Sequence, residues 1–200
     1  MLYQLSYLAL PRDPSADPAR ATIAPPVSPS RQLFVLRHAK SSWDDPELDD
    51  RERPLAPRGR RATKALAEHI RATGIEPAQV LCSSALRTQE TLEGVAPAGE
   101  HLIEPELYSA SAQELVERLR GVPEEFPSVM VIGHNPTVQE LVLELAGAST
   151  GSARDAELAR IQRKFPTGAL ATLTFDCGWG ELAPGCAQLV GFVRPKDLSR

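Results

Sequence analysis

Four side chains in this sequence have the chemistry to bind and transfer a phosphoryl group. Arg37 and His38 follow one apolar segment directly, Arg87 follows a second within a few residues, and His134 follows a third after one glycine. Arginine presents a fork of donors that matches phosphate oxygens. A neutral imidazole supplies a nitrogen nucleophile near neutral pH. If these segments meet, two guanidiniums and two imidazoles surround one point.

The three apolar segments have the pattern of buried strands, and each is followed by a helical pattern. We predict strands at residues 32–36, 79–83 and 129–132. In an open α/β sheet, ligands bind beyond the carboxyl ends of the parallel strands. The four side chains are therefore expected at one edge of the sheet, where they form a pocket for a phosphoryl group.

Strand and helix patterns alternate along the chain, which is typical of an α/β protein. A helix is predicted from Pro57 to a stop at Gly74, and another follows His134, with Asn135 as its N-cap and Pro136 as its first residue. Other helical and strand patterns lie at residues 86–95, 102–103, 115–119, 169–175 and 188–193. We predict a three-layer α/β/α sandwich with a mostly parallel central sheet.

The first thirty residues differ in composition from the rest. Residues 11–30 contain six prolines among small and charged residues, too little apolar surface to offset the entropy of ordering. We predict a disordered, Pro-rich arm over residues 1–30 and one folded domain over residues 31–200. Residues 147–165 are predicted to be a polar segment that contains a short helix.

The composition is that of an ordinary globular protein, and it disfavours some classes of binding partner. The 200 residues carry a formal net charge of −4, and no run of Lys and Arg suggests a track for nucleic acid. No segment approaches the length of a transmembrane helix, so no membrane partner is expected. Three cysteines without CxxC spacing favour free thiols and a reducing compartment. We expect a cytoplasmic protein that acts on a phosphorylated protein or a small phosphate-bearing substrate.

The motifs together resemble the histidine phosphatase (phosphoglycerate mutase-like) superfamily, and in particular its SixA-type phosphohistidine phosphatases. The resemblance covers the chain from about Gln32 to Leu198. It is carried by residues 36–39 (Leu-Arg-His-Ala), 83–91, 133–136 (Gly-His-Asn-Pro), the turn 53–55 with Gly59, and 165–169. An Arg-His pair alone is a weak signal, but three motifs in order at strand ends are specific.

The resemblance implies a role for each of the four residues. His38 would be the nucleophile and become phosphorylated, Arg37 and Arg87 would bind the phosphoryl oxygens, and His134 would stabilise the transition state. Water would then hydrolyse phospho-His38. The resemblance implies no metal ion and no cofactor, and it makes the domain at residues 31–200 a histidine phosphatase domain.

Several further residues are weaker candidates. The commoner family pattern has glycine, often followed by glutamate, after Arg-His, whereas this chain has Ala39 and Lys40. Lys40 and Ser41 are possible substrate-binding residues. Members that act on alkyl phosphates use a carboxylate as general acid, for which Glu106 is the best candidate. The weak signal for an acid favours phosphohistidine as the substrate, because imidazole leaves with less help than an alkoxide.

Two other functions fit the same residues. The first alternative is a phosphatase of small phosphate esters, with Glu106 as its acid. The second is a phosphate-binding or phosphocarrier module with slow turnover. A mutase is disfavoured, because little chain remains for a lid that would retain the phosphate. A cysteine-dependent phosphatase is also disfavoured, because Cys82 and Arg87 are one residue too close for the C-x5-R spacing and the loop lacks glycine. We read Cys82 as a buried strand residue.

Overall fold

A single mixed sheet forms the centre of the protein. The computed structural model describes residues 30–147 and 153–198. Within them the sheet has the order β3-β2-β4-β1-β5-β6, in which β1, β2, β3 and β4 run parallel, β5 runs antiparallel to β1, and β6 runs antiparallel to β5. Their bounds are β1 (Arg31–Arg37), β2 (Gln79–Ser83), β3 (Glu100–Glu104), β4 (Ser128–Gly133), β5 (Leu170–Phe175) and β6 (Gln188–Val193). The predicted mostly parallel sheet is confirmed.

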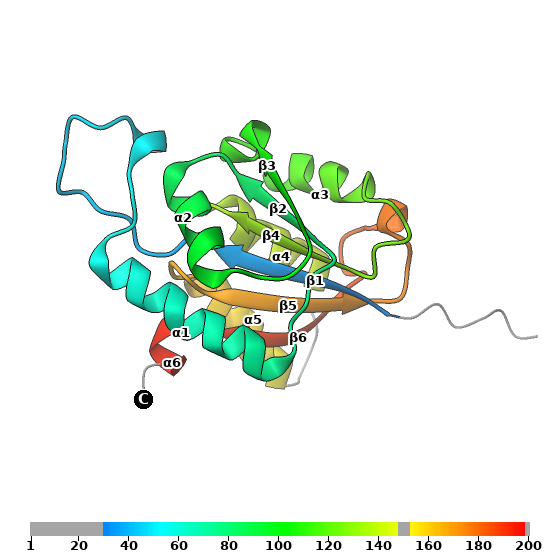
Figure 1. The fold of residues 1–200 in the computed structure, drawn as a ribbon. Helices are drawn as coiled ribbons and strands as arrows, with labels where there is room; N and C mark the ends of the chain where they lie inside the picture. Colours follow the sequence, from blue (N-terminus) through cyan, green and yellow to red (C-terminus); the bar gives the residue numbers. More distant parts are fainter. Residues whose placement is uncertain (1–29, 148–152, 199–200) are drawn as a thin grey trace, which may run out of the picture.

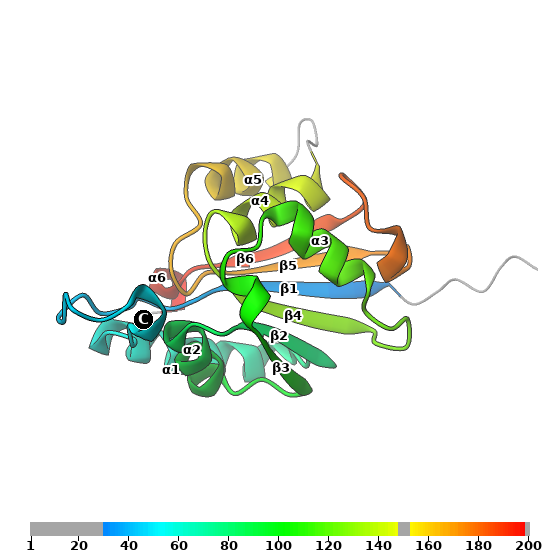
Figure 2. The same cartoon turned by 90° about the horizontal axis from the view of Figure 1, so that it is seen from above.

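Helices cover both faces of this sheet, as Figure 2 shows. One face carries α1 (Pro57–Thr73) and α2 (Leu86–Val95), with the short α6 (Pro195–Leu198) packed beside α1. The other carries α3 (Ala112–Arg120), α4 (Thr137–Ala146) and α5 (Ala153–Arg163). Short 3-10 helices lie at η1 (Asp50–Glu52), η2 (Pro105–Tyr108) and η3 (Trp179–Glu181). The three-layer prediction is therefore confirmed (Figure 1).

Strand β1 is buried on both of its faces, which explains its continuous apolar sequence. Side chains alternate between the two faces of a strand. Accordingly, Leu33 and Val35 belong to the core under α3, α4 and α5, whereas Phe34 and Leu36 belong to the core under α1 and α2. A strand covered on both faces reads as a continuous apolar run. Arg37, the last residue of β1, is where this core ends.

Helix α1 lies against the segment that follows His38. It begins at Pro57, as predicted, and it is capped at Gly74, which has a φ of 66°. A Cβ built on Gly59 would lie 2.2 Å from the carbonyl oxygen of Lys40. That oxygen accepts a hydrogen bond of 2.9 Å from the backbone of Ala56. Glycine at position 59 thus allows the helix to approach the backbone next to His38.

The prediction for the start of α4 was wrong. We expected Asn135 to cap the helix and Pro136 to be its first residue, but the helix begins at Thr137 and Pro136 occupies the N-cap position. The Asn135 amide instead donates to the side-chain oxygen of Gln139 over 2.8 Å and to the carbonyl of Phe165 over 3.3 Å. The local pattern misplaced the boundary, because the Asn135 side chain contacts Gln139 and Phe165 and accepts no hydrogen bond from the first turn of the helix.

Two predictions fall partly outside the described residues. The predicted Pro-rich arm lies outside them apart from Ser30, and β1 begins at Arg31. The polar segment at residues 147–165 contains α5, and its residues 148–152 are not among the described residues. Over the described ranges, no helix has the length and apolar character to cross a membrane.

Candidate active site

The three parallel strands β2, β4 and β1 deliver the predicted side chains to one edge of the sheet. They are neighbours in the order β2-β4-β1, so their carboxyl ends lie together. The backbone of His38 donates to the carbonyl of Gly133 over 3.0 Å, which joins the segment after β1 to the end of β4. The rings of His38 and His134 lie 5.1 Å apart between centroids. The predicted convergence of the two imidazoles is present.

His38 is held as a neutral imidazole with a defined tautomer. Its side chain is buried, and Nδ1 lies 2.7 Å from the carbonyl oxygen of Ala39. A carbonyl oxygen only accepts hydrogen bonds, so Nδ1 carries the proton and Nε2 keeps its lone pair. Burial lowers the pKa of His38 to about 3. The hydrogen bond to Ala39 opposes this shift, whereas protonation of His134 and the charges of Arg87 and Arg37 add to it. At neutral pH the Nε2 atom is available as a nucleophile.

His134 is a second neutral imidazole. Its Nε2 atom lies 2.8 Å from the hydroxyl oxygen of Ser83, at the end of β2. Burial, followed by the nearby Arg87, lowers the pKa of His134 to about 4. The Nδ1 atom is buried and has no hydrogen-bond partner among the described residues. Such an orphaned polar atom is costly unless a ligand or water satisfies it.

Arg37 is anchored by the segment that precedes β5. Its Nη1 atom donates to the carbonyl of Phe165 over 2.7 Å, while Nε is buried without a partner among the described residues. The Gly168 amide donates in turn to the carbonyls of Arg37 and His38, at 3.1 and 3.0 Å. Burial lowers the pKa of the Arg37 guanidinium. The segment 165–168 therefore braces both residues of the Arg-His pair.

Arg87 is held by an acidic residue that the sequence did not single out. Its Nη2 atom donates to the carboxylate of Asp50 over 2.8 Å, and its Nη1 atom donates to the Asp50 carbonyl. The Tyr108 hydroxyl donates to the same carboxylate over 2.7 Å, and Arg53 donates to its other oxygen over 2.8 Å. The bond from Tyr108 is the largest cause that lowers the pKa of Asp50 to about 2, and Arg87 adds to it. Asp50 thus organises this side of the site.

Tyr108 also borders the imidazole of His134. Its ring lies 5.6 Å from that of His134 between centroids, in an edge-to-face arrangement, and the Arg51 guanidinium lies over it. The hydrogen bond to Asp50 is the main cause that raises the pKa of the Tyr108 hydroxyl. Sequence reasoning missed Tyr108, and the only available signal was its position two residues after Glu106.

Glu106, predicted as the general acid, lies outside this cluster. It is exposed and lines a separate cavity of about 650 Å³ together with Glu104, Glu114 and Arg118. Among the described residues it forms no hydrogen bond or ion pair. In the same 3-10 helix, Leu107 is buried in the core and Tyr108 contacts the imidazole. The turn thus presents tyrosine, rather than glutamate, to the site.

The two weaker binding candidates behave differently. Lys40 is exposed at the rim, where it lines a second cavity together with Arg37. Ser41 is buried, and its hydroxyl accepts a hydrogen bond of 3.1 Å from Arg53. Ser41 therefore supports the Arg53 side chain that holds Asp50.

The cysteines take no part in the site. Burial raises the pKa of Cys82 to about 12, which keeps the thiol protonated at neutral pH. Cys177 and Cys186 are free as well. The described residues contain no group of three or more His, Cys, Asp or Glu side chains arranged to hold a metal ion.

The comparisons with known proteins agree with this geometry. Residues 33–111 match the model of the histidine phosphatase superfamily (branch 1). The chain is 31% identical over 152 residues to the phosphohistidine phosphatase SixA of Escherichia coli, covering 72% of this chain and 86% of that protein.

Two solved structures extend the likeness to the fold. A protein of Nakamurella multipartita assigned as a SixA phosphohistidine phosphatase superposes with a TM-score of 0.74 and 30% identity, covering 83% of this chain and 96% of that one. A SixA protein histidine phosphatase in complex with tungstate gives 0.68 and 27%, covering 84% and 99%.

Proposed function

This chain belongs to the histidine phosphatase superfamily, in its SixA-type branch, and we propose that it removes the phosphoryl group from phosphohistidine on a partner protein. The proposed reaction passes through a covalent intermediate on His38 and uses no metal ion. The observation that carries it is the state of His38. This buried imidazole donates from Nδ1 to the Ala39 carbonyl and keeps the Nε2 lone pair free.

In the first step, Nε2 of His38 attacks the phosphorus of the substrate. A new P–N bond forms while the P–N bond of the substrate phosphohistidine breaks, and its electron pair returns to the leaving imidazole. The leaving nitrogen takes a proton from water. In the second step, water attacks the phosphorus of phospho-His38, the P–N bond breaks and its electron pair returns to Nε2, and inorganic phosphate leaves. A proton of the attacking water neutralises the hydroxide that the first step left behind.

Charge stabilisation is the second requirement, because phosphoryl transfer depends on positioning and electrostatics. Arg37 and Arg87 both lie close enough to lower the pKa of each imidazole, and they supply guanidinium donors for the equatorial oxygens. The buried Nδ1 atom of His134, which has no partner among the described residues, is suited to a hydrogen bond with a phosphoryl oxygen. A SixA protein of the same fold has been solved in complex with tungstate, a tetrahedral oxyanion like phosphate, which supports a site for a phosphoryl group in this chain.

The leaving group favours phosphohistidine over an ester. An alkoxide leaving group needs a general acid, whereas imidazole needs less help. The cluster around His38 contains Asp50 as its carboxylate, but Asp50 accepts from Arg87 and Tyr108 and has its pKa lowered to about 2. An acid that stays ionised at neutral pH is a poor proton donor. This site is therefore better equipped for a phosphoramidate.

Phosphate release in EDTA tests the proposal. The wild-type chain and a His38→Ala variant are compared on a phosphohistidine-bearing phosphotransfer domain and on an aryl phosphate. We expect turnover of the phosphohistidine protein by wild type, no turnover by the variant, and a slower aryl phosphatase rate. Equal phosphate release by both proteins would refute the role of His38. Stoichiometric labelling of His38 without turnover would instead indicate a phosphocarrier.

A further inference from the structure

A strongly basic cavity lies beside the site and includes Arg37 in its wall. Its volume is about 560 Å³, and eight of its twelve lining residues are Lys or Arg. It is bordered by Lys40 after β1, by the start of α1, by the end of α5 and by the start of α6, segments that Figure 1 shows converging at this end of the sheet. Among the described residues that line the cavity, none is acidic.

Most of these cations have no carboxylate partner. Arg160 pairs with Glu157, and Arg194 pairs with Asp197. The other six form no ion pair with any described residue: Arg37, Lys40, Arg58, Arg163, Lys164 and Lys196. Because the whole chain has a net charge of −4, this concentration of positive charge is a local property of one face. It would attract a negatively charged partner to this face.

The cavity is joined directly to the nucleophile. Arg37 lines the cavity and is the chain neighbour of His38. The segment 165–168 borders both, since Pro166 and Thr167 line the cavity while the Gly168 amide donates to the carbonyls of Arg37 and His38. A substrate whose phosphoryl group is at His38 therefore reaches the cavity with the residues next to its phosphohistidine.

The exposure of the cations indicates what kind of anion they meet. Five of the six unpaired cations are exposed, and Arg37 alone is partly buried. Exposed Lys and Arg side chains give little energy per pair, but as a group they steer a partner and fix its orientation. A site for a small polyanion would instead hold it with buried, preorganised donors. The arrangement suits an acidic protein face.

We infer that the basic cavity docks an acidic segment that flanks the phosphohistidine of the partner protein. This inference rests on the proposed function and deepens it, because it assigns the substrate a charge pattern. Asp or Glu side chains next to the phosphohistidine would lie among Arg58, Lys164 and Lys196, which come from three different parts of the chain. The substrate preference would then depend on residues outside the catalytic cluster.

Two synthetic phosphohistidine peptides test this inference. They share one sequence except for the flank, which carries Asp and Glu in one and Asn and Gln in the other. Phosphate release is measured against His38→Ala as background. At low salt we expect the acidic peptide to be favoured in kcat/KM by at least about tenfold. The preference should shrink as the ionic strength rises, because salt screens exposed charges.

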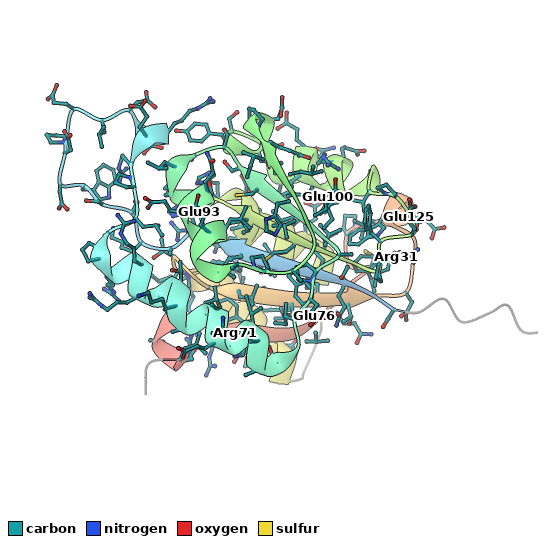
Figure 3. The ribbon with its side chains drawn as sticks, viewed as in Figure 1. Arg31, Arg71, Glu76, Glu93, Glu100 and Glu125 are labelled. Carbon is teal, nitrogen blue, oxygen red and sulfur yellow. The ribbon has the colours of Figure 1, made fainter. Side chains whose placement is uncertain are left out.

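A pair of triple variants locates the preference on the surface. The variant with Arg58→Gln, Lys164→Gln and Lys196→Gln should lose most of it. The matched control carries Arg61→Gln, Lys64→Gln and Arg71→Gln, which are exposed on α1 outside the cavity lining and remove the same charge. Arg71 lies in the last turn of α1, at the other end of the helix from Arg58 (Figure 3). The control should keep the preference.

The outcomes separate this inference from the proposed function. Equal hydrolysis of both peptides by wild type would overturn the docking site and leave the phosphohistidine phosphatase intact. Hydrolysis of neither peptide would overturn both. A preference that survives the cavity variant would also overturn the docking site. A third result would also overturn the docking site: a wild-type protein without flank preference that is inhibited by inositol hexakisphosphate. The cavity would then bind a small polyanion.

Discussion

The Arg87 guanidinium donates a 2.8 Å hydrogen bond to the carboxylate of Asp50, so a negative charge lies against a side chain that is expected to bind phosphate. Asp50 accepts from Tyr108 and Arg53 at the same time. The carboxylate therefore orients Arg87 and also competes with an incoming oxyanion. These two effects can be separated by substitution.

Replacing Asp50 with asparagine should strengthen oxyanion binding. The amide oxygen of Asp50→Asn can still accept from Arg87, but the repelling charge is gone. We expect the inhibition constant of tungstate to fall roughly threefold to tenfold, which corresponds to about 1 kcal/mol. Competition against aryl phosphate hydrolysis measures it. An unchanged or weaker inhibition would mean that Asp50 acts on Arg87 only as a structural support.

Removing the Arg87 guanidinium should slow the reaction without unfolding the protein. If Arg87 stabilises charge in the transition state, Arg87→Ala should lower kcat by roughly 10²–10³-fold. Arg87→Lys is the control that keeps the charge and removes the fork of donors. Single-turnover phosphorylation of His38 measures the step directly. Full activity of the alanine variant would show that the pocket has been misassigned.

Both site imidazoles should stay neutral well below the usual histidine range. Burial is the main cause that lowers the pKa of His38 to about 3 and that of His134 to about 4. We expect neither ring to titrate between pH 8 and pH 5 in NMR spectra, against an unperturbed pKa of about 6.5. Spectra of His38→Ala and His134→Ala would provide the assignments. A midpoint near 6.5 for either ring would contradict this electrostatic description.

The same shifts predict how stability depends on pH. The unfolded chain takes up protons on these histidines as the pH falls through about 6.5, whereas the folded chain does so only near 3 to 4. The unfolded state therefore binds more protons in this window, and the free energy of unfolding falls with decreasing pH. The slope is at most about 1.4 kcal/mol per pH unit for each imidazole. Urea unfolding at pH 7, 6 and 5 measures it, and His134→Gln should reduce the slope.

The general-acid role expected of Glu106 stays a prediction that one substitution tests. If Glu106 protonates an ester leaving group, Glu106→Gln should slow aryl phosphate hydrolysis and spare phosphohistidine hydrolysis. Its exposed position, among Glu104, Glu114 and Arg118, leads us to expect little change with either substrate. Glu114→Gln, in the same cavity, is the matched control. A selective loss of the ester activity would restore Glu106 as the acid.

The fold class and the residues at the strand ends follow from the amino-acid sequence alone. Buried parallel strands read as continuous apolar runs, and their carboxyl ends must share one edge of the sheet. For that reason the sequence is sufficient to name Arg37, His38, Arg87 and His134. The start of α1 is also predictable, because Pro57 acts locally. The start of α4 is not, because the Asn135 side chain donates to Gln139 and to distant Phe165 instead of capping the helix.

What surrounds those four side chains depends on tertiary packing. Asp50 and Tyr108 are 58 residues apart, and nothing in either segment indicates that their side chains meet beside Arg87. The basic cavity combines the start of α1, the end of α5 and the start of α6, whose charges are ordinary when each segment is considered by itself. Strand ends have a common geometry that follows from the sheet, whereas loop and helix-end side chains take their directions from packing between distant segments.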